Sequence, residues 1–280
     1  MSTDRTPDNR LGAKSLNVRI EGPCSGESRN PEPSKTTPVP SVALGSCLRR
    51  SAVRRIVTPP ERGNAKELPM DDTNDYTAED ALIVVDPQLD FCPDGRLAVA
   101  DGDTVMAPIA ALAERFRHVV VTQDWHPAGH SSFASSHPGR RAFDTIRMPY
   151  GEQVLWPDHC VQGSSGADFH PDIAGAVARA GLILRKGANP AVDSYSAFYE
   201  NDKATPTGLA GYLRDKGVRR CVLVGLAYDF CVSWSALDAR REGFAALVLT
   251  GYTRAIALPA GAGSSVDAAE AAMRAAGVSF

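Results

Sequence analysis

Short apolar runs alternate with stretches of helical spacing from residue 76 to residue 280. The first run, 81–86, is apolar at every position until it ends in a carboxylate. A continuous apolar run of this length is typical of a strand that is buried on both faces of a parallel sheet. Four similar runs follow, at 118–124, 182–186, 221–226 and 245–250.

Helical patterns separate these runs. In residues 103–116, Val105, Ile109 and Leu112 recur every three or four positions, as one buried helix face requires. Strands that alternate with helices favour right-handed crossovers and helices on both faces of the sheet. We therefore expect an α/β fold, a three-layer α/β/α sandwich around a mainly parallel sheet of about six strands, with 278–280 as a short edge strand. Further helices are predicted at 171–180, 207–216, from about 231, and 265–276.

Residues 1–75 differ from the rest of the chain. They are rich in Ser, Pro, Thr, Arg, Gly and Asn and show no apolar period. Such a composition buries too little apolar surface to offset the entropy of ordering. We predict a disordered extension over 1–75, followed by one folded domain over 76–280. The extension is open to three interpretations: a regulatory tail, a targeting segment, or a start assigned too early, since Met70 lies just before the domain.

The charge is distributed unevenly along the chain. Residues 1–69 hold 12 Lys and Arg against 7 Asp and Glu, whereas residues 70–280 hold 18 against 26. The acidic balance of the second part argues against nucleic acid or an anionic membrane as the main partner. No apolar stretch is long enough to span a bilayer, and no secretory signal is present. Six cysteines without CxxC spacing favour the reducing cytoplasm. The sequence leaves homo-oligomer formation open.

Side chains that can do chemistry lie where four predicted strands end. Asp86, Asp124 and Lys186 close three strands, and a short turn leads from the fourth to Cys231. Ligands of open α/β sheets bind outside the carboxyl ends of the strands, so we expect these groups to meet. Cysteine can then supply an attacking sulfur, aspartate can take its proton, and a lysine ammonium can stabilise the thiolate. A structural ion pair between Asp86 and Lys186 is the plainer alternative.

Cys231 falls at the first turn of a predicted helix. The backbone N–H groups and the helix dipole at such a position favour a thiolate. The alternative is that Cys231 is a small buried core residue, which is the common fate of a free cysteine. Cys160 is a rival nucleophile by residue type, and we interpret it as a packing residue.

Five of the six histidines fall between residues 126 and 170. Pro127 and Gly129 place His126 and His130 on a loop rather than on one helix face. Two or three imidazoles with one carboxylate are the ligand set of a divalent transition metal with open positions. Loop histidines that only form hydrogen bonds are the alternative.

Five motifs give the chain a more specific interpretation. Over about residues 80 to 280 it resembles the nicotinamidase branch of the isochorismatase-like cysteine hydrolases, in which these motifs occur in the same order. The two histidine motifs indicate that branch rather than its metal-free relatives. The motifs are Asp86-Pro87-Gln88-Leu89-Asp90-Phe91, then Asp124-Trp125-His126-Pro127 with His130, Ser132 and Phe133, then Trp156-Pro157 with His159-Cys160, then Lys186-Gly187 with Asp193-Ser194-Tyr195-Ser196-Ala197-Phe198, and last Gly225-Leu226-Ala227 with Asp229 and Cys231-Val232.

The resemblance implies an isochorismatase-like hydrolase fold and a catalytic triad of Asp86, Lys186 and Cys231. It also implies a cis peptide between Leu226 and Ala227, which would aim the backbone N–H groups of Ala227 and Cys231 at an oxyanion. The ring pocket that it implies is lined by Phe91, Trp156 and Tyr195.

The resemblance further implies one divalent metal held by Asp124, His126 and His159, with His130 as a further ligand or a supporting group. Zinc is the expected metal, with iron and manganese as alternatives. The implied activity is hydrolysis of nicotinamide to nicotinate and ammonia through a thioester on Cys231, in NAD salvage, with pyrazinamide as a further substrate. The alternatives are another amidase, carbamoyl hydrolase or ether hydrolase of the family, an inactive homologue that acts as a binding protein, and a zinc hydrolase that activates water.

Overall fold

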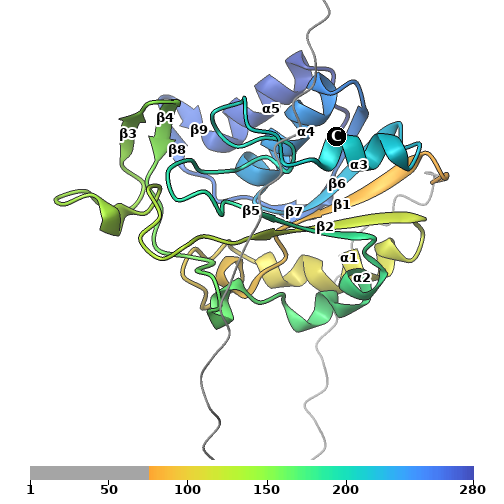
Figure 1. Cartoon of the computed structure of the whole chain (residues 1–280), viewed down its shortest axis with the longest axis horizontal. Coiled ribbons are helices and arrows are strands. Elements are labelled where there is room, and N and C mark those ends of the chain that lie inside the picture. The colour runs from red at the N-terminus through yellow and green to blue at the C-terminus, as the bar shows by residue number, and fades with distance from the viewer. Residues whose placement is uncertain (1–75) are drawn as a thin grey trace, which may run out of the picture. The chain divides into compact units, whose positions relative to one another are not determined.

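A central parallel sheet organises the domain (Figure 1). The structure is a computed structural model that describes residues 76–280, so the predicted extension lies outside the described residues. Five strands follow the order β5-β2-β1-β6-β7, and every neighbouring pair is parallel. The strands are β1 (Asp80–Val85), β2 (His118–Asp124), β5 (Leu182–Lys186), β6 (Arg220–Leu226) and β7 (Ala245–Arg254).

Helices cover both faces of this sheet, which confirms the predicted three-layer α/β/α sandwich. In Figure 1, α1 and α2 lie below the sheet and the other three helices lie above it. The expected edge strand at 278–280 is reduced to one parallel bridge between Ser279 and Leu247, which leaves five full strands. The helices are α1 (Met106–Ala113), α2 (Ala174–Arg179), α3 (Leu209–Asp215), α4 (Ser233–Arg241) and α5 (Ser265–Ala275).

Two hairpins occur in stretches where the sequence predicts only loops and turns. The first pairs β3 (Thr145–Met148) with β4 (Gly151–Val154), and the second pairs β8 (Pro259–Ala260) with β9 (Gly263–Ser264). Among their residues only Gln153 is buried, so neither hairpin shows an apolar run. Periodicity therefore gives no signal for them. Among the described residues, no helix is both long and apolar enough to cross a membrane.

The parallel arrangement brings the strand ends together. β1 lies at the centre of the sheet, and all of its residues are buried. Because β1, β2, β5 and β6 run in the same direction, their carboxyl ends open on one edge. Asp124 at the end of β2 stands directly beside Lys186 at the end of β5. The sheet therefore delivers the predicted strand-end residues to one place, as expected of an open α/β sheet.

Gly225 allows β6 to pass close to β1 just before this edge. Its φ is +105°, and a Cβ atom there would lie 2.2 Å from the carbonyl oxygen of Val85. Only glycine adopts this backbone conformation without strain. The close approach and the conformation together require a residue with no side chain at this position.

We expect Gly225→Ala to lower the free energy of unfolding by about 3 kcal/mol or more, because strain and overpacking both act on it. Gly211→Ala is the matched control, since Gly211 lies in the exposed part of α3 with no atom near its Cβ position. It should raise the same free energy by about 0.5–1 kcal/mol. Urea unfolding followed by circular dichroism measures both, and equal stabilities would contradict the argument.

Candidate active site

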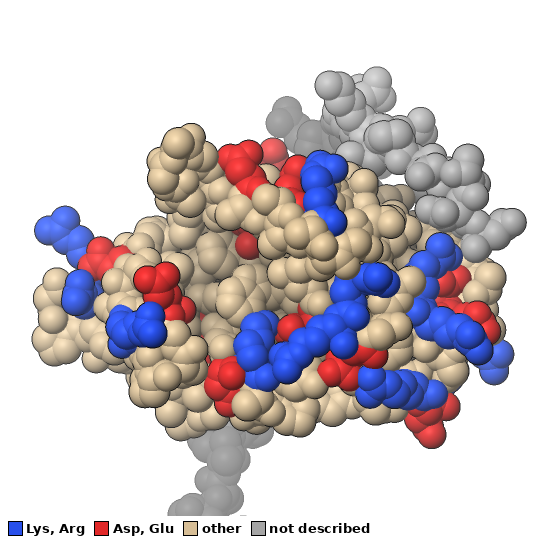
Figure 2. All heavy atoms as spheres, turned by 90° about the horizontal axis from the view of Figure 1, so that it is seen from above, with Lys and Arg blue, Asp and Glu red and all other residues tan. Residues whose placement is uncertain are grey.

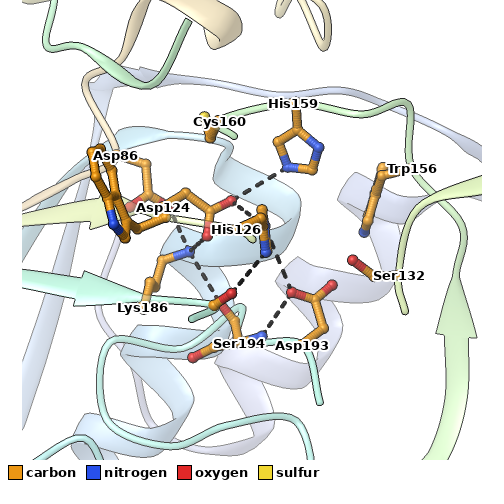
Figure 3. Close-up of polar contacts among 12 residues, drawn as sticks. Asp86, Asp124, His126, Ser132, Trp156, His159, Cys160, Lys186, Asp193 and Ser194 are labelled. Carbon is orange, nitrogen blue, oxygen red and sulfur yellow. Dashed lines mark hydrogen bonds and ion pairs between the residues drawn. The ribbon is translucent and has the colours of Figure 1, made fainter. Parts of the chain in front are cut away.

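Lys186 is the charged centre of the site (Figure 3). Its Nζ lies 2.8 Å from Asp86 Oδ2, 3.1 Å from Asp124 Oδ1 and 3.5 Å from Cys231 Sγ. Nζ also donates to the carbonyl oxygen of Ser194 at 2.9 Å. Burial alone would lower the pKa of the Lys186 ammonium, but Asp124 and Asp86 hold that pKa well above its usual value. Lys186 is therefore a permanent buried cation that touches the sulfur and both carboxylates.

Asp86 follows β1 directly and has a left-handed backbone with φ +45°. Thr122 Oγ1 donates to Asp86 Oδ1 at 2.6 Å and accepts from the Asp86 N–H at 3.0 Å. The other oxygen, Oδ2, faces the Lys186 ammonium but accepts no well-directed hydrogen bond from the described residues. Burial raises the pKa of the Asp86 carboxyl although Lys186 opposes the shift. Asp86 is thus a stronger base than a surface aspartate, and its Oδ2 is paired with the ammonium without a directed hydrogen bond.

Cys231 lies on a π-helical turn, Tyr228–Val232, between β6 and α4. The sequence predicts a helix from about Cys231, whereas α4 begins two residues later, at Ser233. Burial raises the pKa of the Cys231 thiol well above its usual value, and Lys186 offsets only part of this shift. The structure therefore favours a protonated resting thiol over the thiolate that the sequence predicts. Such a thiol needs a base before it can attack.

The peptide between Leu226 and Ala227, just before this turn, is cis, as the resemblance implies. Ala227 and Cys231 line the same pocket. Asp229 holds the turn in place, since its carboxylate accepts from the N–H groups of Ile256 and Ala257 at 3.0 and 2.9 Å. The turn is therefore tied to the chain that follows β7.

Three atoms that could bind a metal lie together beside Lys186, one each from Asp124, His126 and His159. Asp124 Oδ2 lies 3.0 Å from His126 Nε2 and 3.3 Å from His159 Nε2. The Nδ1 of His126 lies 3.0 Å from the carbonyl oxygen of Gly187, and that of His159 lies 2.8 Å from that of Pro157. A carbonyl oxygen only accepts, so the Nδ1 of each ring donates to it and each ring turns its Nε2 toward Asp124. This donor set fits a divalent cation.

Asp124 supplies the anionic part of this set. Burial raises the pKa of its carboxyl, but His126 and Lys186 outweigh burial and hold the pKa well below its usual value. Gln88 fixes the backbone of Asp124, because its side-chain amide accepts from the Asp124 N–H at 2.7 Å and donates to the Asp124 carbonyl at 2.8 Å. The carboxylate is thus both ionised and fixed in place.

His130 does not turn a free nitrogen toward Asp124. Its Nδ1 accepts from the Ser132 N–H at 3.1 Å, and its Nε2 donates to the carbonyl oxygen of Asn189 at 2.7 Å. Its ring packs 4.5 Å from the ring of His126. Of the two roles that the resemblance left open, neither is decided by this geometry, because His130 forms a second possible metal-binding group with His126 and Asp193, apart from His159.

A pocket is lined by Cys231 on one side and by Asp124, His126 and His159 on the other, and it holds about 310 Å³, part of it open to solvent. Phe91, Trp156 and Tyr195, the three predicted ring-binding residues, all line it. Trp156 Nε1 donates to the Tyr195 hydroxyl at 3.0 Å, which locks two of these walls together. Cys160 is fully buried and is absent from the pocket wall, as expected of a packing residue.

Two supporting residues escaped the sequence reasoning. Thr122 orients Asp86, and its signal was a lone hydroxyl inside the apolar run of β2. Gln153 of β4 is buried beneath the pocket, where its amide nitrogen lies 2.7 Å from the Tyr195 hydroxyl and 2.9 Å from Asp193. No pattern in the sequence distinguishes Gln153 from the other glutamines.

The model of the isochorismatase domain matches residues 80–256. The chain belongs to the isochorismatase family. The matched residues run from the start of β1 to the loop after β7, so the family domain contains the whole candidate active site.

The relatives that the chain resembles are named as nicotinamidases or pyrazinamidases. The chain is 51% identical to the nicotinamidase of Acinetobacter baylyi over 176 residues, which are 63% of this chain and 81% of that protein. The structure of the Acinetobacter baumanii nicotinamidase and pyrazinamidase has a TM-score of 0.69, with 49% identity over 72% of this chain and 95% of that chain. The pyrazinamidase of Pyrococcus horikoshii, solved in complex with zinc, has a TM-score of 0.56, with 33% identity over 72% of this chain and 97% of that chain.

Removal of the central cation tests this description of the site. Lys186→Met leaves Asp86 and Asp124 without their shared partner, so it should cost about 3–5 kcal/mol of unfolding free energy. Arg219→Met is the control, because Arg219 pairs with Glu79 at 3.3 Å while both side chains are exposed. It should cost about 1 kcal/mol or less. Chemical denaturation measures both, and a loss for Lys186→Met as small as that of the control would contradict the assignment.

Proposed function

We propose that the chain is a nicotinamidase, an amidohydrolase that converts nicotinamide and water to nicotinate and ammonia. The observation that carries this proposal is the position of Lys186, whose Nζ contacts both Asp86 Oδ2 and Cys231 Sγ, the sulfur in the wall of an aromatic pocket. A base, a cation and a sulfur are the parts of a cysteine amidase. The names of the relatives from Acinetobacter support the same substrate.

The proposed chemistry begins with proton transfer. Asp86 takes the proton of the Cys231 thiol, and the Lys186 ammonium stabilises the thiolate that forms. The sulfur then attacks the amide carbon, and the backbone N–H groups of Ala227 and Cys231 donate to the oxyanion. A preorganised donor of this kind contributes on the order of 3 kcal/mol.

The second half of the reaction uses the same base. Asp86 gives its proton to the leaving nitrogen, so ammonia departs and a thioester joins the ring carbonyl carbon to Cys231. Asp86 then deprotonates a water molecule, which attacks the thioester and releases nicotinate. The proton returns to the sulfur, and the free enzyme is restored.

The remaining residues bind the ring. Phe91, Trp156 and Tyr195 hold its faces and edges, which orients the carboxamide toward the sulfur. Asp124, His126 and His159 would hold one divalent metal, with zinc favoured by the donor set and by the zinc complex of the Pyrococcus relative. Such a metal would supply a Lewis acid that polarises the ring.

We propose pyrazinamide as a second substrate and the cytoplasm as the compartment of the reaction. Pyrazinamide also carries a ring nitrogen meta to its carboxamide, so the same pocket and sulfur would act on it. Nicotinate is a precursor for pyridine nucleotides, and we place the reaction in cytoplasmic NAD salvage.

Replacing the nucleophile gives the sharpest test of the covalent route. Cys231→Ala should lower kcat/KM for ammonia release from nicotinamide about 10⁴-fold or more, because no other group can form the thioester. Cys160→Ala should keep most of the activity, since that thiol is absent from the pocket wall. Mass spectrometry of quenched wild-type enzyme should show a nicotinoyl adduct on Cys231. Turnover retained by Cys231→Ala would remove the sulfur from the mechanism.

Metal content tests the other half of the site. His159→Ala removes one lone pair from the cluster, so the purified protein should bind far less than one equivalent of zinc after dialysis, as measured by atomic emission. His170→Ala is the control, because His170 lies on the same stretch but outside the cluster. Prolonged chelation should abolish nicotinamide hydrolysis, and zinc, iron or manganese should restore it. Full activity of a metal-free sample would contradict the proposed metal site.

A further inference from the structure

One aromatic side chain, Phe230, stands between the pocket and a larger groove outside it. Phe230 is in the wall of both spaces. The groove holds about 1450 Å³, part of it open to solvent, between the β3–β4 hairpin, α4, α5 and the loop before β8. Figure 2 shows a hollow beside the protruding hairpin, lined mainly by uncharged residues. Phe230 is thus a partition between two spaces of very different size.

The position of this partition is fixed by its neighbours. The Phe230 ring meets Trp156 edge to face, with centroids 4.8 Å apart and an interplanar angle of 88°. It meets Tyr195 at 5.7 Å and 78°. Its backbone N–H donates to the carbonyl oxygen of Ala227 at 3.1 Å, within the turn that carries Cys231. These contacts fix the position of the Phe230 ring relative to Cys231 and to the ring-binding residues Trp156 and Tyr195.

The groove offers an uncharged surface. Trp234, Leu237 and Leu258 are among its lining residues, and the only charged side chain in its wall is Asp229. The carboxylate of Asp229 already accepts three hydrogen bonds, from two backbone N–H groups and from Ser265. An occupant would meet apolar walls and no free charge, so the groove suits an uncharged apolar group.

We propose that Phe230 sets the size limit of the substrate. With phenylalanine at this position the pocket takes a single-ring amide and excludes amides that carry a bulky apolar group on the ring. A shorter side chain joins the pocket to the groove, and the groove then holds that group while the carboxamide stays at Cys231. This inference rests on the proposed function, because it concerns the substrates of the same site.

The test compares the wild type, Phe230→Ala and Leu237→Ala. Each is assayed with nicotinamide and with nicotinamides that carry one phenyl group on ring carbon 2, 5 or 6. In Phe230→Ala, kcat/KM for at least one phenyl-bearing amide, relative to nicotinamide, should rise roughly tenfold or more over the wild-type ratio. Leu237 lines only the groove, so Leu237→Ala should keep the wild-type ratios. Unchanged ratios in Phe230→Ala for all three amides would overturn the proposal.

A second variant and a binding measurement keep the test decisive. Phe230→Leu retains more apolar side-chain volume than Phe230→Ala. Thermal unfolding of both variants shows whether each is folded. A folded Phe230→Leu should raise the same kcat/KM ratio less than Phe230→Ala does. If the wild type fails to hydrolyse nicotinamide, the proposed function fails. The role of Phe230 as a size limit is then tested by calorimetric titration of the wild type and both variants with the matching phenyl-substituted nicotinic acids. Binding that is tighter in the variants than in the wild type supports it, and equal binding overturns it.

Discussion

The buried ammonium of Lys186 lies within contact of two carboxylates that serve different ends of the site. Without that cation, Asp86 and Asp124 would place two negative charges in the same dry interior, at a cost that few folds tolerate. Because one cation satisfies both, the proposed base and the proposed anionic metal ligand can stand side by side. The proposed nucleophilic chemistry and metal binding would therefore depend on one shared charge balance.

Burial acts in the same direction on the three acids around this cation, but their neighbours do not. Burial raises the pKa of the Cys231 thiol and of the Asp86 carboxyl, whereas His126 and Lys186 outweigh burial at Asp124 and hold the pKa of its carboxyl well below its usual value. In the proposed mechanism, the sulfur stays in its less reactive, protonated form until Asp86 takes the proton, since a thiolate is the reactive form.

The sequence predicted the sheet and the strand-end residues because buried parallel strands are long apolar runs, and a charge at their exit is conspicuous. It missed the β3–β4 hairpin and Gln153, since that hairpin buries no apolar face. The cis peptide at Leu226–Ala227 came from family resemblance, as no propensity encodes it. The start of α4 was placed too early because the apolar spacing continues through the π-helical turn. The catalytic and metal-binding roles of the site residues remain predictions.

The direct pairing of Asp124 with Lys186 across β2 and β5 has a consequence for how this domain can vary. Successive side chains on a strand point to opposite faces, so inserting or deleting one residue in either strand would send one partner to the wrong side of the sheet. Length changes inside these strands should therefore be absent among active homologues. The site would evolve by exchange of loops around strands of fixed length.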